Sequence, residues 1–260
     1  QRSKMPVTMS KRSRVPDRSC NRVVLRDATN RNIDSTRLYD LSSVGRLVRG
    51  RQFIPHANII NSIERTLIAL RINPEEVDVA AKYGAYSTQM SLIVTLPSIF
   101  DFDPGYMDPF RLQLVFHNCL SRGGLRLLAR WFQEETGSIF SVGVSQLNAS
   151  LAHRIPAREE NILPTFKKAV ELAREDSERL NQWISQDISE EDFLNWVAGS
   201  IRRMWGKKGS REIQAQFESD EERRSVFDML ISLAGYSMKT KDLLKQCDRV
   251  VEGAVLMRSL

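Results

Sequence analysis

Cysteine and histidine are scarce in this chain of 260 residues, which contains three of each. Cys20, Cys119 and Cys247 are odd in number and far apart, so they do not predict a disulfide framework. Because unpaired cysteines are typical of a reducing compartment, we expect a protein of the cytoplasm of a bacterial host cell, or of an equivalent compartment. His117 and Cys119 are both zinc-ligand types, but no second pair of ligands has the spacing of a zinc site. We therefore interpret them as a buried corner.

Catalytic signatures and long apolar runs are missing as well. Gly-x-Ser-x-Gly, His-Glu-x-x-His, Walker and dinucleotide-binding motifs do not occur, which argues against the enzyme classes that use them. No apolar run has the length of a membrane span, and the N-terminal residues lack the hydrophobic core of a secretory signal. We therefore expect no enzyme, no cofactor and no membrane association. A metal-dependent nuclease with carboxylates from distant parts of the chain is a weaker alternative.

Three aspartates, Asp101, Asp103 and Asp108, lie close together around Pro104-Gly105. Hard cations need several carboxylate oxygens within one small cage. Pro104-Gly105 interrupts the ligand order of an EF-hand, however, and no glutamate stands at the closing position. Aspartates in turns also accept hydrogen bonds from nearby backbone N–H groups. We favour this turn interpretation and predict no metal site.

Positive charge is plentiful and unevenly distributed. The net charge is +6 and the pI is about 9.4, which favours an anionic partner or serves solubility alone. Residues 1–51 hold thirteen Lys and Arg against four acids, so this part carries +9 and the remainder −3. Residues 1–45 are poor in apolar periodicity and are typical of a flexible arm. The arm is either a solvated tail or a phosphate-binding segment in which Lys11, Arg12 and Arg14 contact nucleic acid.

Apolar periodicity after the arm predicts an α+β protein. The stretch 59–70 has a helical stripe, whereas 112–116 alternates in the manner of a strand. Helices are expected near 53–70, 164–184, 189–206, 219–235 and 243–255, and strands near 23–25, 77–81, 89–96, 112–116 and 139–144. We expect three parts: a basic arm at 1–45, an α+β core at 46–156 and a helical region at 157–260 packed on the core. The fold class is a small antiparallel sheet flanked by helices and followed by a C-terminal helical bundle.

The stretch from Pro109 to Trp131 combines the clearest strand pattern with a Gly123-Gly124 break. After the break, apolar residues fall at helical spacing, and Arg122, Arg126 and Arg130 recur every four residues. We therefore predict a helix there with the three arginines along one face. Such a face could follow the backbone of a nucleic acid.

A second basic segment lies between two predicted helices. It has five cations beside Trp205 and contains Gly206 and Gly209, so we predict a flexible loop that the phosphate backbone can approach closely. The order of a P-loop is not present. An ordinary solvated loop is an equal alternative. The candidate contacts are Arg202, Arg203, Lys207, Lys208 and Arg211.

The chain from Gly50 onward resembles a phage- and plasmid-borne family of unknown function, known as phage/plasmid-like proteins. The resemblance rests on Gly50-Arg51-x-Phe53 before a helix, and on a strand that ends near Asn118 in the sequence FHNCL. His117 and Cys119 replace the small residue and the glycine of the family, which puts any activity of that turn in doubt. The resemblance implies an origin in a mobile element and no particular chemistry.

These observations predict a nucleic-acid-binding protein of a phage or other mobile element. Single-stranded DNA, in recombination or annealing, is the expected ligand, with Tyr83 or Tyr86 stacking on bases and a homo-oligomer extending the groove. DNA is favoured over RNA. A helix, a small antiparallel sheet and a helix also describe Rad52-like annealing proteins, which is an analogy at the level of the fold. The alternative is a counter-defence or regulatory module that binds a host protein.

Overall fold

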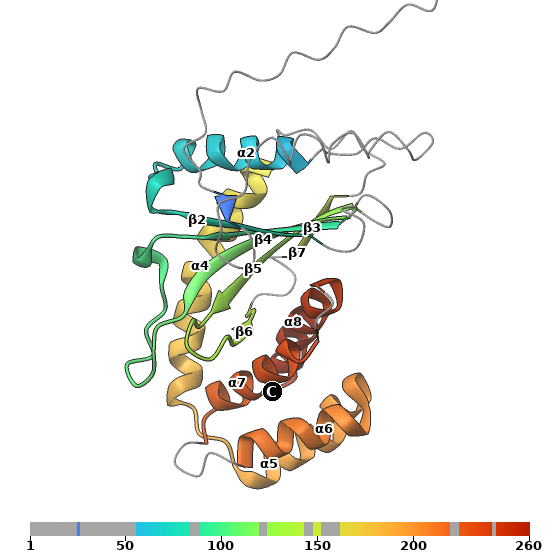
Figure 1. The fold of residues 1–260 in the computed structure, drawn as a ribbon. Helices are drawn as coiled ribbons and strands as arrows, with labels where there is room; N and C mark the ends of the chain where they lie inside the picture. The colour runs from blue at the N-terminus through green and yellow to red at the C-terminus, as the bar shows by residue number, and fades with distance from the viewer. Residues whose placement is uncertain are drawn as a thin grey trace, which may run out of the picture.

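The computed structural model describes residues 25–26, 56–83, 89–119, 124–142, 148–151, 162–218, 224–240 and 243–260. The described residues form a β-sheet with helices packed against it, and a group of C-terminal helices follows (Figure 1). The α+β class predicted from the sequence is confirmed. The candidate contacts Lys11, Arg12, Arg14, Arg122 and Tyr86 lie outside the described residues.

The sheet has seven strands within the described chain, in the order β1-β2-β3-β4-β5-β6, and β7 also pairs with β5. Strands β2 to β5 form an antiparallel meander, while the short β1 runs parallel to β2. The strands are β1 (Leu25–Arg26), β2 (Asp78–Tyr83), β3 (Gln89–Thr95), β4 (Arg111–Cys119), β5 (Gly124–Phe132), β6 (Ile139–Phe140) and β7 (Asn148–Leu151).

One face of the sheet is apolar and packs against α2 (His56–Ala69) and α4 (Ile162–Ser185). Alternate residues of β4, such as Leu114 and Phe116, join a core cluster that also contains Ile59 of α2. The Phe116 ring stacks on that of Phe166 in α4, with 6.1 Å between the ring centroids. Figure 1 shows α2 lying along the sheet on this side. The helical stripe predicted at 59–70 is therefore the core face of α2.

The opposite face of the sheet carries polar side chains that are also buried. Gln113 of β4 stands directly opposite Thr95 of β3 and Arg130 of β5. Its amide donates to Thr95 Oγ1 at 3.1 Å and accepts from Arg130 Nε at 2.9 Å. Four residues further along β4, His117 stands opposite Ser91 of β3, and His117 Nδ1 lies 2.8 Å from Ser91 Oγ. These cross-strand bonds satisfy polar groups that the sheet removes from water.

The C-terminal helices join the sheet through an aromatic cluster. The Phe227 ring centroid lies 5.9 to 6.0 Å from those of Phe102, Phe110 and Phe140. A capping box between Ser225 and Asp228 fixes the start of the helix that carries Phe227. The helices are α5 (Glu190–Trp196), a π-helical turn η7 (Val197–Ile201), α6 (Arg202–Glu218), α7 (Val226–Met238) and α8 (Leu243–Met257).

The helix predicted after the Gly123-Gly124 break is wrong, because the segment forms strand β5. It pairs with β4 over the whole length, from Arg111 opposite Phe132 to Cys119 opposite Gly124. A spacing of four residues places side chains on one face of a strand as well as of a helix, so the arginine pattern fits both structures. The long hairpin with β4 decides the outcome, since it pairs the backbone of both strands.

Other boundaries differ in smaller ways. The basic segment at 202–211 is helical and not a loop, α7 continues to Met238, and strand β7 was not expected. The predicted capping pair at 219–222 lies outside the described residues. Among the described helices, none combines the length and the apolar character needed to cross a membrane.

Candidate anion-binding pocket

A half-open pocket of about 410 Å³ lies where α5 and η7 meet α6. The chain before Gly206 contributes residues spaced as one helix face, and the chain after Gly206 contributes a second face at similar spacing. The pocket is therefore the outer groove of a helical hairpin. Its lining residues are Leu194, Val197, Ala198 and Arg202 from the first face, and Lys207, Ser210, Arg211 and Gln214 from the second.

Local sequence explains how the hairpin forms. Ser189 caps α5 by accepting the backbone N–H of Asp192 at 3.1 Å. Gly206 has φ 71° and ψ −174°, a conformation that is essentially restricted to glycine, and it breaks α6 into two segments. Gly209 allows the segments to approach, because a Cβ there would lie 2.6 Å from Trp205 Cβ. Both glycines thus shape the turn.

The inner side of the hairpin is fixed to the remaining bundle. The Phe193 and Phe217 rings stack at 3.9 Å, which joins the two arms of the hairpin. Trp196 Nε1 donates to the backbone oxygen of Leu256 at 3.3 Å. Trp205 Nε1 donates to Glu252 Oε2 at 2.6 Å. These contacts hold the hairpin against the other C-terminal helices, and the Trp205 N–H is already hydrogen-bonded to Glu252 of α8.

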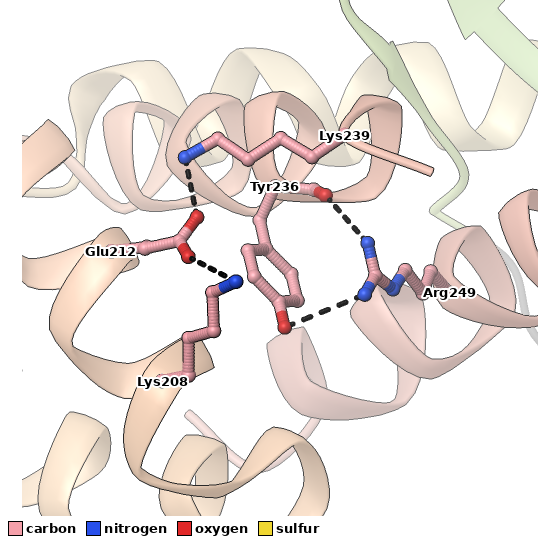
Figure 2. Close-up of polar contacts among 5 residues, drawn as sticks. All are labelled: Lys208, Glu212, Tyr236, Lys239 and Arg249. Carbon is pink, nitrogen blue, oxygen red and sulfur yellow. Dashed lines mark hydrogen bonds and ion pairs between the residues drawn. The ribbon is translucent and has the colours of Figure 1, made fainter. Parts of the chain in front are cut away.

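The structure divides the cations of α6 between two sides. Away from the pocket, Lys208 of α6 and Lys239 at the end of α7 both pair with Glu212, at 3.9 and 2.5 Å (Figure 2). The hydrogen bond from Lys239 lowers the pKa of Glu212. Arg249 of α8 stacks over the Tyr236 ring, 4.3 Å from its centroid, and donates to the Tyr236 backbone oxygen at 3.1 Å. Lys239 and Arg249 thus link α7 to α6 and to α8, whereas the Lys208 pair lies within α6.

The cations that line the pocket are also exposed, but they carry no such partners within the described chain. Arg202, Lys207 and Arg211 make no ion pair with any other described residue, and no acidic residue lines the pocket. A new helical segment begins at Lys207, so its first N–H groups and its dipole add positive potential at the same end. Arg203 is also exposed but does not line the pocket. The result is a concave site with three positive charges and an apolar part, formed by Leu194, Val197 and Ala198, which we call its floor.

The arginines predicted to form one helical face do not belong to this site. Arg130 is buried in the sheet beside Gln113, and burial lowers its pKa to about 10. Arg126 is half-exposed and pairs with Asp248 of α8 at 2.8 Å. Arg130 is buried and hydrogen-bonded, Arg126 is paired with an acid, and neither lines the pocket, so neither enters the candidate site. Tyr83, one of the two tyrosines predicted to stack on bases, is the last residue of strand β2.

The acidic segment behaves as a turn. Asp103 Oδ1 accepts the backbone N–H of Gly105 at 2.8 Å, which is the turn interaction weighed against the metal reading. Asp101 is half-buried, and burial raises its pKa. Among the described residues, no group of three or more His, Cys, Asp or Glu side chains is placed to hold a metal ion. His117 lies within β4 and not at a corner.

The sequence indicated the cations of the pocket but not its interior. Residues Leu194, Val197 and Ala198 recur at helical spacing, and this pattern was a usable signal. Ser210 and Gln214 extend the face of Lys207 and Arg211, which becomes visible only once 207–218 is known to be helical. Comparisons of the chain with protein-family models, with curated proteins and with solved structures found no match.

Proposed function

We propose that this protein binds nucleic acid and that the cations of the pocket contact the phosphate backbone. The observation that carries the proposal is the group Arg202, Lys207 and Arg211, which is exposed, free of ion pairs with described residues and gathered around one concavity. Other exposed cations either pair with an acid, as Arg224 does with Glu190, or lack such a partner among the described residues but do not line this concavity, as Lys168 and Arg174 of α4.

The residue types suit phosphate. A guanidinium offers a planar fork of donors that matches two phosphate oxygens, and an ammonium acts as a strong point charge. The start of a helical segment at Lys207 adds backbone N–H groups and the positive end of the helix dipole. Unpaired surface cations stay hydrated until an anion arrives, and each phosphate contact then releases counterions.

A polyanion explains the charge pattern better than a small anion does. Arg203 extends the positive surface beyond the pocket, and a single phosphate would leave it unused. The +9 charge of residues 1–51 provides a second basic segment in the same chain. A repeating phosphate backbone can contact both. This supports nucleic acid as the partner, with a role in recombination or annealing of a mobile element as the expected setting.

The test is the salt dependence of oligonucleotide binding by the full chain. A labelled single-stranded DNA is titrated by fluorescence anisotropy across a salt series, with the wild type and two double variants. Lys207→Gln/Arg211→Gln removes two pocket cations. Lys168→Gln/Arg174→Gln removes one lysine and one arginine from exposed positions of α4 and is the matched control.

The pocket variant should weaken binding and reduce the slope of log K against log salt concentration by about 1.4, since each phosphate contact of a single strand contributes about 0.7. The control should keep the wild-type slope. Equal slopes for both variants would contradict the assignment of the site. Binding of no oligonucleotide at low salt would overturn the proposed function and favour a host protein as the partner.

A further inference from the structure

We infer that the pocket receives one unpaired nucleobase, so that the site selects single-stranded over double-stranded nucleic acid. This inference rests on the proposed function, because it names what occupies the interior of the same site. The cations account for the rim of the pocket. They do not account for its floor or for its size.

The floor is apolar and accessible. Leu194 is 38% exposed, and Ala198 is exposed beside it, while Val197 lies beneath them in the core. A phosphate ion held by the cations would leave this apolar surface in contact with water. Placing the phosphate directly against the carbon atoms would instead cost its own hydration. A flat, weakly polar ring would cover the floor and remove apolar surface from water. A volume of about 410 Å³ is in the range of small-molecule sites and exceeds the need of a phosphate group.

Polar atoms at the edge of the pocket suit the edge of a base. The Gln214 side chain donates Nε2 to Glu218 Oε1 at 2.8 Å, which orients the amide and leaves its oxygen as an acceptor. Ser210 Oγ donates to the backbone oxygen of Lys207 at 3.1 Å, so its lone pairs remain acceptors. Bases carry N–H donors on the edges that face outward when they are unpaired.

Arginine supplies the stacking surface that aromatic residues supply in many single-strand sites. The planes of Arg202 and Arg211 can lie over a base while their N–H groups reach the adjoining phosphates. Trp205 does not compete for this role, since it is bound to Glu252 and packs against Tyr236 with ring centroids 4.9 Å apart. The base would therefore lie between the apolar floor and a guanidinium plane.

A duplex does not present such a base. Each base of a duplex is stacked and paired, and its removal from the stack costs free energy before any contact with the pocket forms. The phosphates of a duplex still reach the rim cations. The site should consequently bind both forms through its charges and prefer the single strand through its floor.

The experiment compares three ligands with the full chain across one salt series: a single-stranded DNA, an oligomer of the same length made of abasic nucleotides, and the duplex. The abasic strand keeps the phosphates and removes the bases. Ala198→Phe fills the floor without changing charge. Ala215→Phe, at an exposed position of α6 that does not line the pocket, is the control.

The wild type should bind the ordinary strand at least about fivefold more tightly than the abasic strand or the duplex, as expected for one stacked base. Ala198→Phe should remove this preference and keep the salt slope, whereas Ala215→Phe should change neither. Equal wild-type affinity for ordinary and abasic strands would overturn the inference and leave the proposed function standing. The abasic comparison needs no variant, so equal affinities would overturn the inference even if Ala198→Phe fails to fold. Failure of the wild type to bind any of the three ligands would instead overturn the proposed function itself.

Discussion

Replacing Asp176 with asparagine should make the stability of the protein much less dependent on pH between about 4 and 7. Asp176 lies on α4 with 3% of its surface exposed. Its Oδ1 is 4.0 Å from Arg179 Nη1, and its Oδ2 has no hydrogen-bond partner among the described residues. Burial raises the pKa of Asp176 to about 6, against the opposing effects of Arg179 and Arg258, and Glu175 raises it further.

The sign follows from proton binding. Between pH of about 3.8 and pH of about 6, the folded state holds a proton on Asp176 that the unfolded state has released. The folded state therefore binds more protons, and stability falls as the pH rises through this window. A shift of about two pKa units corresponds to at most about 3 kcal/mol of stability, present in acid and lost above pH of about 6. Asparagine cannot ionise, so Asp176→Asn should not show this loss.

The assay is urea unfolding of the wild type and Asp176→Asn at intervals from pH 4 to pH 7.5. The difference in free energy of unfolding between the two should grow in favour of the variant by up to about 3 kcal/mol across the series. Glu178→Gln removes an exposed acid of the same helix and should follow the wild type. If Asp176→Asn and the wild type gave parallel curves, Asp176 would not be a buried carboxyl group with a raised pKa, and the reasoning would be refuted.

Two further predictions concern the stability of the helical region. Gly206→Ala should destabilise the protein by about 1 to 3 kcal/mol in urea unfolding, because the backbone there has φ 71° even though a Cβ would meet no other atom. The control is Gly199→Ala, at a position with equal space and no positive φ, which should be neutral or stabilising. Equal effects of the two variants would contradict backbone strain at Gly206. Phe227→Ala should lower the free energy of unfolding by about 3 to 5 kcal/mol, because the Phe227 ring packs among three other rings. A decrease below about 1 kcal/mol in the same urea assay would show that this contact does not hold α7 to the sheet.

The sequence predicted those elements whose periodicity had one reading. The stripe of α2 and the alternation in β2 and β4 each exclude the other structure over their length, and the structure confirms them. The arginine spacing in β5 does not distinguish the two structures, because a period of four residues fits both a helix and a strand. The choice was made by pairing with β4, and a contact of this kind is not visible in the pattern of β5 alone.

Glycine misled the interpretation of 202–211 for a different reason. Gly206 and Gly209 suggested flexibility, yet one makes a defined kink and the other permits close packing against Trp205 and Tyr236. The pocket was out of reach of the sequence because its two faces meet only through the angle at Gly206. The five cations could be named in advance, but not that Lys208 pairs with Glu212 while three others line the groove.

The central claim is that nucleic acid binds at the helical hairpin around Gly206. Hydrogen–deuterium exchange of the full chain, with and without a saturating single-stranded DNA, tests it most directly. The account predicts slower exchange in residues 194–214 on binding, while the inner strands β3 and β4 keep their rates. Bound DNA with unchanged exchange throughout 194–214 would contradict the account and place the interface elsewhere on the chain.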